Sequence, residues 1–81
     1  MFVSVQFHGV HRAITRNNEV AFSVSSGARV SDLVMHIQRA YPNLHLSQDD
    51  FVVSINDQIS SVDHPLHSDD TVAFLPHIGG G

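Results

Sequence analysis

Two segments near the start of the chain alternate between apolar and polar residues. The first covers residues 2–8 and the second covers residues 19–24. A period of two is typical of strands that bury one face. The segment 9–18 between them is polar and includes Gly9 and Asn17-Asn18, which predicts a loop. The pattern therefore predicts an antiparallel hairpin whose loop is longer than the tightest turns.

The hydrophobic period then changes from two to that of a helix. Ser25-Ser26-Gly27 ends the second strand, and one apolar stripe follows at helical spacing: Val30, Leu33, Val34, Ile37 and Tyr41. Ser31 and Asp32 lie in the first turn, where either could cap free amides or complement the helix dipole. Pro42 predicts the end of the helix, because the residue before a proline avoids the helical region.

The second half of the chain reads as shorter strands separated by turns. Residues 51–55 and 71–75 predict strands, and residues 58–60 form at most a short one. Turn residues at 56–57 and 68–70 separate them. The order strand, strand, helix, strand, short strand, strand predicts a two-layer α+β domain with the helix on one sheet face.

The last six residues, 76–81, read Pro-His-Ile-Gly-Gly-Gly and have little to pack. We therefore expect a folded domain over residues 1–75 and a flexible tail over 76–81. Six extended residues reach about 20 Å, which suits threading the carboxylate of Gly81 into a partner's narrow active site. A frayed end without function is the simpler alternative.

The last strand predicts a contact surface at the root of this tail. If Val72 and Phe74 point into the core, Leu75 points outward. Together with Pro76 and Ile78, it would form an exposed apolar strip, a feature that often marks a binding site.

Composition excludes several functional classes. The chain has 81 residues, enough for one domain with a small core. Its net charge of −4 argues against a nucleic-acid-binding surface, and no apolar run approaches the ~20 residues that cross a membrane. The chain contains no cysteine, which excludes disulfides, thiolate metal sites and thiol nucleophiles. We expect a cytoplasmic protein without nucleic-acid or membrane partners.

Seven histidines are many for a chain of this length. His64-x-x-His67 and His8-x-x-His11 have the spacing of possible metal ligands. Each pair lies in an irregular segment or at a strand end, so the two rings need not converge. We interpret them as structural or surface residues and predict no metal site.

Three segments carry a resemblance to a known family: Asp63-His64-Pro65-Leu66, residues 69–76 and Gly80-Gly81. With the opening strand and residues 27–33, they resemble the β-grasp, ubiquitin-like sulfur carriers (the MoaD/ThiS family), and among these the small subunits of molybdopterin synthase. The resemblance covers the whole chain. It implies a mixed sheet of four to five strands, with one main helix packed on one face.

The chain departs from the family pattern at two points. His77 stands where the family often has a second proline, and three glycines end the chain instead of two. Gly80-Gly81 fits the family spacing as the functional end. If Gly79-Gly80 is the functional pair instead, Gly81 must first be removed.

The resemblance implies a non-catalytic carrier. A ubiquitin-activating-type enzyme would adenylate the Gly81 carboxylate with ATP, and a sulfur donor enzyme would convert it to a thiocarboxylate. The large synthase subunit, in a heterotetramer of two large and two small subunits, would take in the tail through Gly79 and Gly80. No cofactor would be tightly bound. The implied docking residues are Phe7, Arg12, Leu75, Pro76, His77 and Ile78, although the alternation also allows Phe7 to be core.

Three alternatives stay open at this point. The first is a sulfur carrier for thiamin synthesis or another thiocarboxylate pathway. The second is a protein modifier joined through Gly81 to lysines of other proteins; the chain has no lysine of its own and cannot form lysine-linked chains with itself. The third is an interaction module whose glycines are inert.

Overall fold

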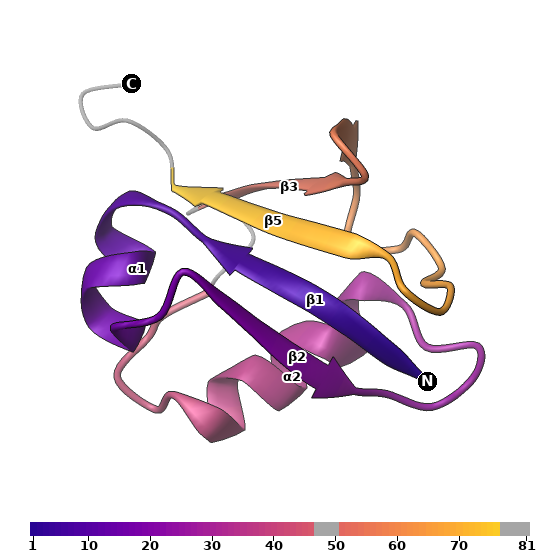
Figure 1. Ribbon diagram of the computed structural model, residues 1–81, viewed down its shortest axis with the longest axis horizontal. Coiled ribbons are helices and arrows are strands. Elements are labelled where there is room, and N and C mark those ends of the chain that lie inside the picture. The colour runs from indigo at the N-terminus through magenta and orange to yellow at the C-terminus, as the bar shows by residue number, and fades with distance from the viewer. Residues whose placement is uncertain (47–50, 77–81) are drawn as a thin grey trace.

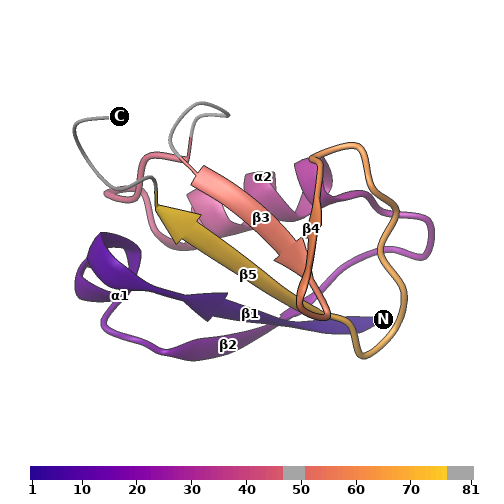
Figure 2. The same ribbon diagram turned by 90° about the horizontal axis from the view of Figure 1, so that it is seen from above.

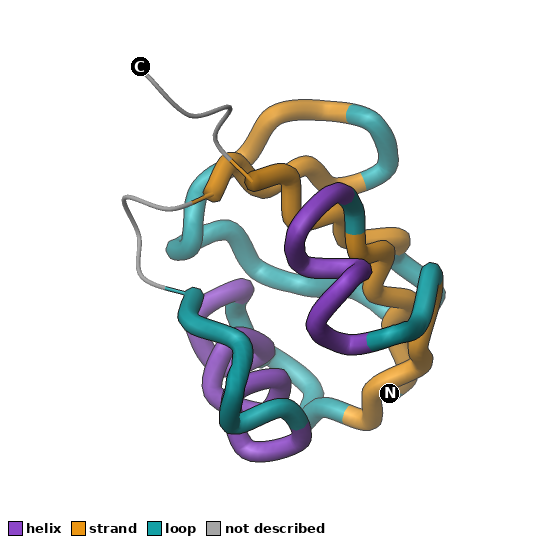
Figure 3. The backbone as a smooth tube through the Cα atoms, turned by 90° about the vertical axis from the view of Figure 1, so that its left-hand side faces the viewer, coloured by secondary structure: helices purple, strands orange, loops and turns teal. Residues whose placement is uncertain are grey.

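The computed structural model describes residues 1–46 and 51–76. In chain order, its elements are β1 (Phe2–Phe7), α1 (Gly9–Thr15), β2 (Glu19–Ser23), α2 (Val30–Ala40), β3 (Phe51–Ile55), β4 (Gln58–Ser60) and β5 (Thr71–Pro76). The strands form one mixed sheet with α2 on one side, and α1 lies at the end of β1 (Figures 1 and 3). The predicted α+β architecture is confirmed.

β5 lies at the centre of the sheet, whose strand order is β2-β1-β5-β3-β4. It runs parallel to β1 and antiparallel to β3, and the pairs β1–β2 and β3–β4 are antiparallel hairpins (Figure 2). The last strand of the chain therefore joins the two hairpins into one sheet.

The core fills the space between α2 and the inner sheet face. β1 contributes Val3, Val5 and Phe7, and β5 contributes Val72 and Phe74, all at most 1 % exposed. Phe74 meets Phe51 edge to face at 5.2 Å between ring centroids. Such pairs add a little to the stabilisation from burial itself. From α2, the buried residues are Val30, Leu33 and Ile37, three members of the predicted stripe.

The start of α2 settles which residue caps it. The Asp32 carboxylate accepts a hydrogen bond of 2.9 Å from the backbone N–H of Arg29, the residue before the helix. The helix ends at Ala40 with Tyr41 as its C-terminal cap, and Pro42 follows as predicted. The Val30 N–H donates to the His64 carbonyl oxygen, which ties the helix to the irregular segment before β5.

The prediction of a loop between the first two strands is wrong. Residues Gly9–Thr15 form α1, seven residues long. A helix this short is not stable alone in water, so tertiary packing must hold it. Its buried side chains are His11 and Thr15, one turn apart, while Val10 and Ile14 are 55 % and 41 % exposed. A polar buried face does not register as a helical stripe in a hydrophobic pattern.

The possible short strand over residues 58–60 is present as β4, and Asn56 and Asp57 form the turn before it with φ of 51° and 70°. Two consecutive positive φ angles are the geometry of the tightest hairpin turn.

Of the helices in the described part of the chain, neither has the length and apolarity to span a membrane.

Candidate functional site

The last two residues of β5 lie beside both β3 and α1, where the chain leaves the fold (Figure 1). Val72 and Phe74 are fully buried, and alternation along the strand places Leu75 on the opposite, outer face. Leu75 is half-buried and directly opposite Val52 of β3, which is also half-buried. The predicted outward orientation of Leu75 is confirmed.

An apolar surface follows from this register. Ala73 and Ser54, each 8 % exposed, are opposite each other on the outer face, and Ile59 of β4 pairs with Ser54 and is 72 % exposed. We call Leu75, Val52 and Ile59 the outer strip. Sequence reasoning missed Val52 and Ile59, because placing them beside Leu75 requires the register of three strands.

Pro76 does not belong to the outer strip, although the sequence grouped it with Leu75. It pairs with Phe51 and has the same parity as Phe74, so its ring is on the α1 side of the strand. There a Cβ at Gly9 would lie 3.5 Å from the Pro76 Cγ. The root of the tail therefore has two different sides, an outer strip and α1.

Of the other predicted docking residues, Phe7 is a core residue. It is 1 % exposed and packs edge to face on Tyr41 at 5.8 Å between ring centroids. Its strand parity points it inward with Val3 and Val5, so it offers no surface to a partner, and its inclusion among the docking residues is corrected. Arg12 is exposed on α1 and borders a hollow with Gln6 and Glu19.

The remaining predicted site residues fall after Pro76. His77, Ile78, Gly79, Gly80 and Gly81 lie outside the described residues, so the flexible tail predicted over 76–81 stays a prediction for them. Its first residue, Pro76, is the last residue of β5.

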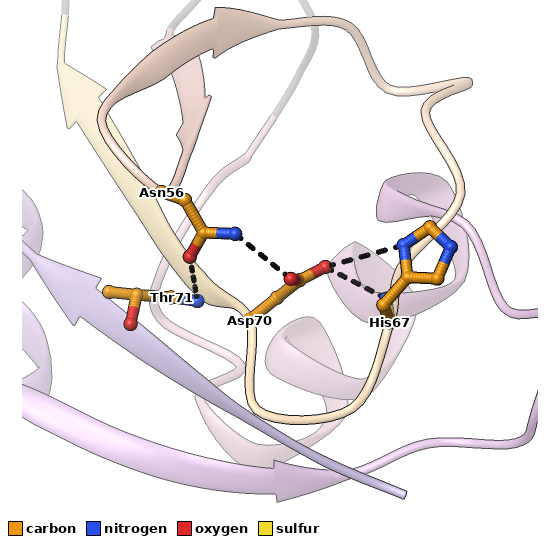
Figure 4. Close-up of polar contacts among 4 residues, drawn as sticks. All are labelled: Asn56, His67, Asp70 and Thr71. Atoms are coloured by element: carbon orange, nitrogen blue, oxygen red, sulfur yellow. Dashed lines mark hydrogen bonds and ion pairs between the residues drawn. The ribbon is translucent and has the colours of Figure 1, made fainter.

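A polar cluster fixes the start of β5, at the other end of the strand from the tail (Figure 4). The Asp70 carboxylate, in a residue only 8 % exposed, accepts hydrogen bonds from Asn56 Nδ2 at 3.0 Å and from the His67 backbone N–H at 2.8 Å. The Asn56 Oδ1 accepts a further bond from the Thr71 N–H at 3.0 Å. Sequence reasoning gave Asp70 only to a turn. Its contacts with both turns could not be predicted from the sequence, because they depend on how close the two turns lie in the fold.

The histidine pairs are not arranged as metal ligands in the described residues. His8 is exposed whereas His11 is 3 % exposed, so the two face different environments. The His67 side chain is 76 % exposed, with its Nδ1 4.0 Å from the Asp70 carboxylate. Across residues 1–46 and 51–76, no group of three or more histidine, aspartate or glutamate side chains is placed to hold a metal.

The model of the ThiS family matches residues 5–81 of this sequence. The chain belongs to the ThiS family. The match includes β5 and the glycine-rich end, the segments on which the predicted family resemblance chiefly depends. A comparison with curated protein sequences found no significant match.

Several solved structures are similar to this ThiS-family chain. SAMP1 from Haloferax volcanii superimposes with a TM-score of 0.88 at 19 % identity, with complete coverage of both chains. A putative molybdopterin converting factor subunit 1 from Pyrococcus furiosus gives 0.81 at 24 % identity, covering 95 % of this chain and 98 % of that one. A complex of subunits 1 and 2 of the molybdopterin-converting factor from Helicobacter pylori gives 0.66 at 21 % identity, with complete coverage of both chains.

These similarities establish the β-grasp fold, as the family resemblance implied. The neighbours include molybdopterin converting factor subunits and small archaeal modifier proteins, and Urm1 from Trypanosoma brucei gives a TM-score of 0.73 at 18 % identity. The ThiS-family chain therefore shares its fold with proteins that are named for several different pathways.

Proposed function

We propose that this chain is the small, sulfur-carrying subunit of molybdopterin synthase and acts in the cytoplasm. The observation that carries the proposal is the outer strip at the root of the tail. Leu75 and Val52 form an apolar surface beside the end of β5, and only five residues follow Pro76, three of them glycine. A partner that covers such a strip has the terminal carboxylate within its reach.

The chemistry needs an activated terminus, because a carboxylate is a poor electrophile. A carboxylate oxygen of Gly81 would attack the α-phosphorus of ATP, which releases pyrophosphate and leaves an acyl adenylate. A sulfide equivalent from the donor enzyme would then attack the acyl carbon and displace AMP, giving the thiocarboxylate. The large subunit would accept the tail and pass its sulfur to a pterin precursor, with water taking the acyl group so that the Gly81 carboxylate is regenerated. Two such transfers would supply the two sulfurs of the dithiolene.

The chain itself would supply the carried group and the surfaces for docking, and the partner proteins would supply the catalytic groups. Two large and two small subunits would form the synthase. A solved neighbour that is a complex of subunits 1 and 2 of the converting factor supports a partner of this kind. The outer strip and Arg12 would contact it.

A protein modifier is the second candidate, and the similarity to SAMP1 over the complete length of both chains favours it. Activation at Gly81 would be the same, but the acyl group would pass to an amine of another protein. A carrier for thiamin synthesis shares the activation as well. The resemblance of the Asp63-His64-Pro65-Leu66 segment to the small subunits of molybdopterin synthase is our reason for proposing that carrier first.

The proposal is tested by incubating the full chain with its adenylating enzyme, ATP and a sulfur donor, followed by intact-protein mass spectrometry. We expect the exchange of one terminal oxygen for sulfur. Deleting Gly81 should abolish the exchange and leave the melting temperature unchanged. If the deleted chain reacts as well as the full chain, Gly79-Gly80 is the functional pair. If neither chain reacts, the carrier function is wrong.

A second step separates the pathways. The thiocarboxylated chain is mixed with the large synthase subunit and the pterin precursor, and in parallel with a cell extract. Dithiolene formation in the first reaction supports the molybdopterin carrier. Covalent conjugates in the second reaction, without dithiolene in the first, support the modifier.

A further inference from the structure

The two edges of β5 are held differently near the tail. On one edge, β3 stays paired to the end of the strand, with Phe51 opposite Pro76. On the other edge, pairing with β1 stops at Phe7 and Phe74, because β1 ends there. The last two residues of β5 therefore continue past the end of β1, and α1 occupies that side (Figure 1).

α1 contacts β5 on both sides of Leu75. The His11 side chain is buried, and its Nδ1 lies 3.5 Å from the Phe74 carbonyl oxygen, at the long end of hydrogen-bond range. Two residues earlier, Gly9 lies against the Pro76 ring, and a Cβ at Gly9 would be in van der Waals contact with the Pro76 Cγ at 3.5 Å. The same short helix thus contacts the residue before Leu75 and the residue after it.

The conformation of Gly9 makes this arrangement possible. Its φ is +54°, in the left-handed region that glycine adopts easily and other residues rarely adopt. Because β1 ends at Phe7 and α1 begins at Gly9, the chain turns sharply from strand to helix within two residues. That turn directs α1 back against the end of β5.

We propose that α1 sets the direction in which the tail leaves the domain, and that Gly9 and His11 are positioning residues for the terminal carboxylate. This inference rests on the proposed carrier function. Five residues reach at most about 17 Å, so a change in the direction of the chain at Pro76 would shift the region that the carboxylate can reach. Misplacement of a reacting group lowers the rate of the chemical step more than it weakens docking.

The experiment compares Gly9→Ala with Gly27→Ala. Gly27 also has a positive φ, +86°, but no atom lies within 4 Å of its Cβ position, and it is in the β2–α2 connection, away from the end of β5. Both alanines strain the backbone through a positive φ, and only the one at position 9 lies beside Pro76. Thermal melting measures how much each alanine lowers the melting temperature. ATP–pyrophosphate exchange by the adenylating enzyme, with the chain as its substrate, measures kcat and KM.

We expect both variants to melt at similarly lowered temperatures. Only Gly9→Ala should lower kcat, by about tenfold or more, with KM unchanged because the outer strip is intact. If the wild-type chain is adenylated and the two variants have equal kcat, the positioning role is overturned while the carrier function stands. If the wild-type chain is not adenylated, the carrier function has failed and the inference fails with it.

His11 provides a second test if Gly9→Ala does not fold. His11→Asn retains an N–H donor at the position of Nδ1, and His11→Leu has a similar volume without a polar atom. We expect the asparagine variant to keep the wild-type kcat and the leucine variant to lose it at unchanged KM. Equal kcat for the two variants would overturn the role of His11.

Discussion

Replacing Asp70 by alanine tests whether the polar cluster at the start of β5 stabilises the fold. The substitution removes the acceptor for Asn56 Nδ2 at 3.0 Å and for the His67 backbone N–H at 2.8 Å. Without the carboxylate, the Asn56 side chain is also free to move, and its Oδ1 would lose the hydrogen bond that it accepts from the Thr71 N–H. The two turns would then lose their side-chain link and keep the backbone hydrogen bond of 2.8 Å from the Asn56 N–H to the Thr71 carbonyl oxygen.

The size of the effect follows from these contacts. Hydrogen bonds to a charged group contribute about 1.5–3 kcal/mol each, and both donors belong to exposed residues that water can reach, so the lower value applies. The ion pair with His67 adds little, because the His67 side chain is 76 % exposed and 4.0 Å away. We expect a loss of about 3 kcal/mol, which lowers the melting temperature of a domain this size by about 12–24 °C.

Circular dichroism melting and urea titration would measure the loss. Asp63→Ala is the matched control, because it removes an exposed carboxylate from the same segment and should change stability by less than about 0.5 kcal/mol. Asp70→Asn keeps one acceptor oxygen and should fall between the two. A melting temperature for Asp70→Ala close to that of Asp63→Ala would refute the reasoning, since water would then replace the carboxylate at no loss.

Three further substitutions test the assignments made above. Leu75→Asp should lower stability by about 1 kcal/mol at most and weaken binding to the partner by about 2 kcal/mol or more in titration calorimetry; loss of the fold would show that its face is assigned wrongly. Phe7→Ala should lower the free energy of unfolding by about 3–5 kcal/mol in urea titration, whereas a stable variant with weak partner binding would return Phe7 to the docking surface. Asp57→Gly should raise stability by about 1 kcal/mol or less by thermal melting, because relief of about 1–2 kcal/mol of left-handed strain at φ of 70° exceeds the entropy cost of about 0.5–1 kcal/mol for a glycine; a lower melting temperature would count against this geometry.

The strands and α2 could be predicted from the sequence because their buried faces are apolar and regularly spaced. Val3, Val5 and Phe7 alternate, and the α2 stripe recurs at helical spacing. α1 could not be predicted in this way, because its buried residues are His11 and Thr15 and its apolar residues face outward. Two polar residues one turn apart carry no hydrophobic signal.

The residues of the candidate site likewise fall into those that the sequence could predict and those that it could not. Strand parity alone placed Leu75 outward, since alternation within β5 is local information. Assigning Val52 and Ile59 to the same surface required the pairing of β3 with both of its neighbours. Separating Pro76 from Leu75 required both that pairing and the position of Gly9.

The central place of β5 has a consequence for how the protein is made. This strand follows the other described strands in the sequence, yet the sheet needs it to connect the β1–β2 and β3–β4 hairpins. Isolated two-stranded hairpins are marginally stable at best in water. A nascent or prematurely terminated chain that stops before Thr71 therefore cannot complete its core, and proteases would meet it unfolded. The sheet is therefore complete only when the strand that carries Leu75 and Pro76 is in place.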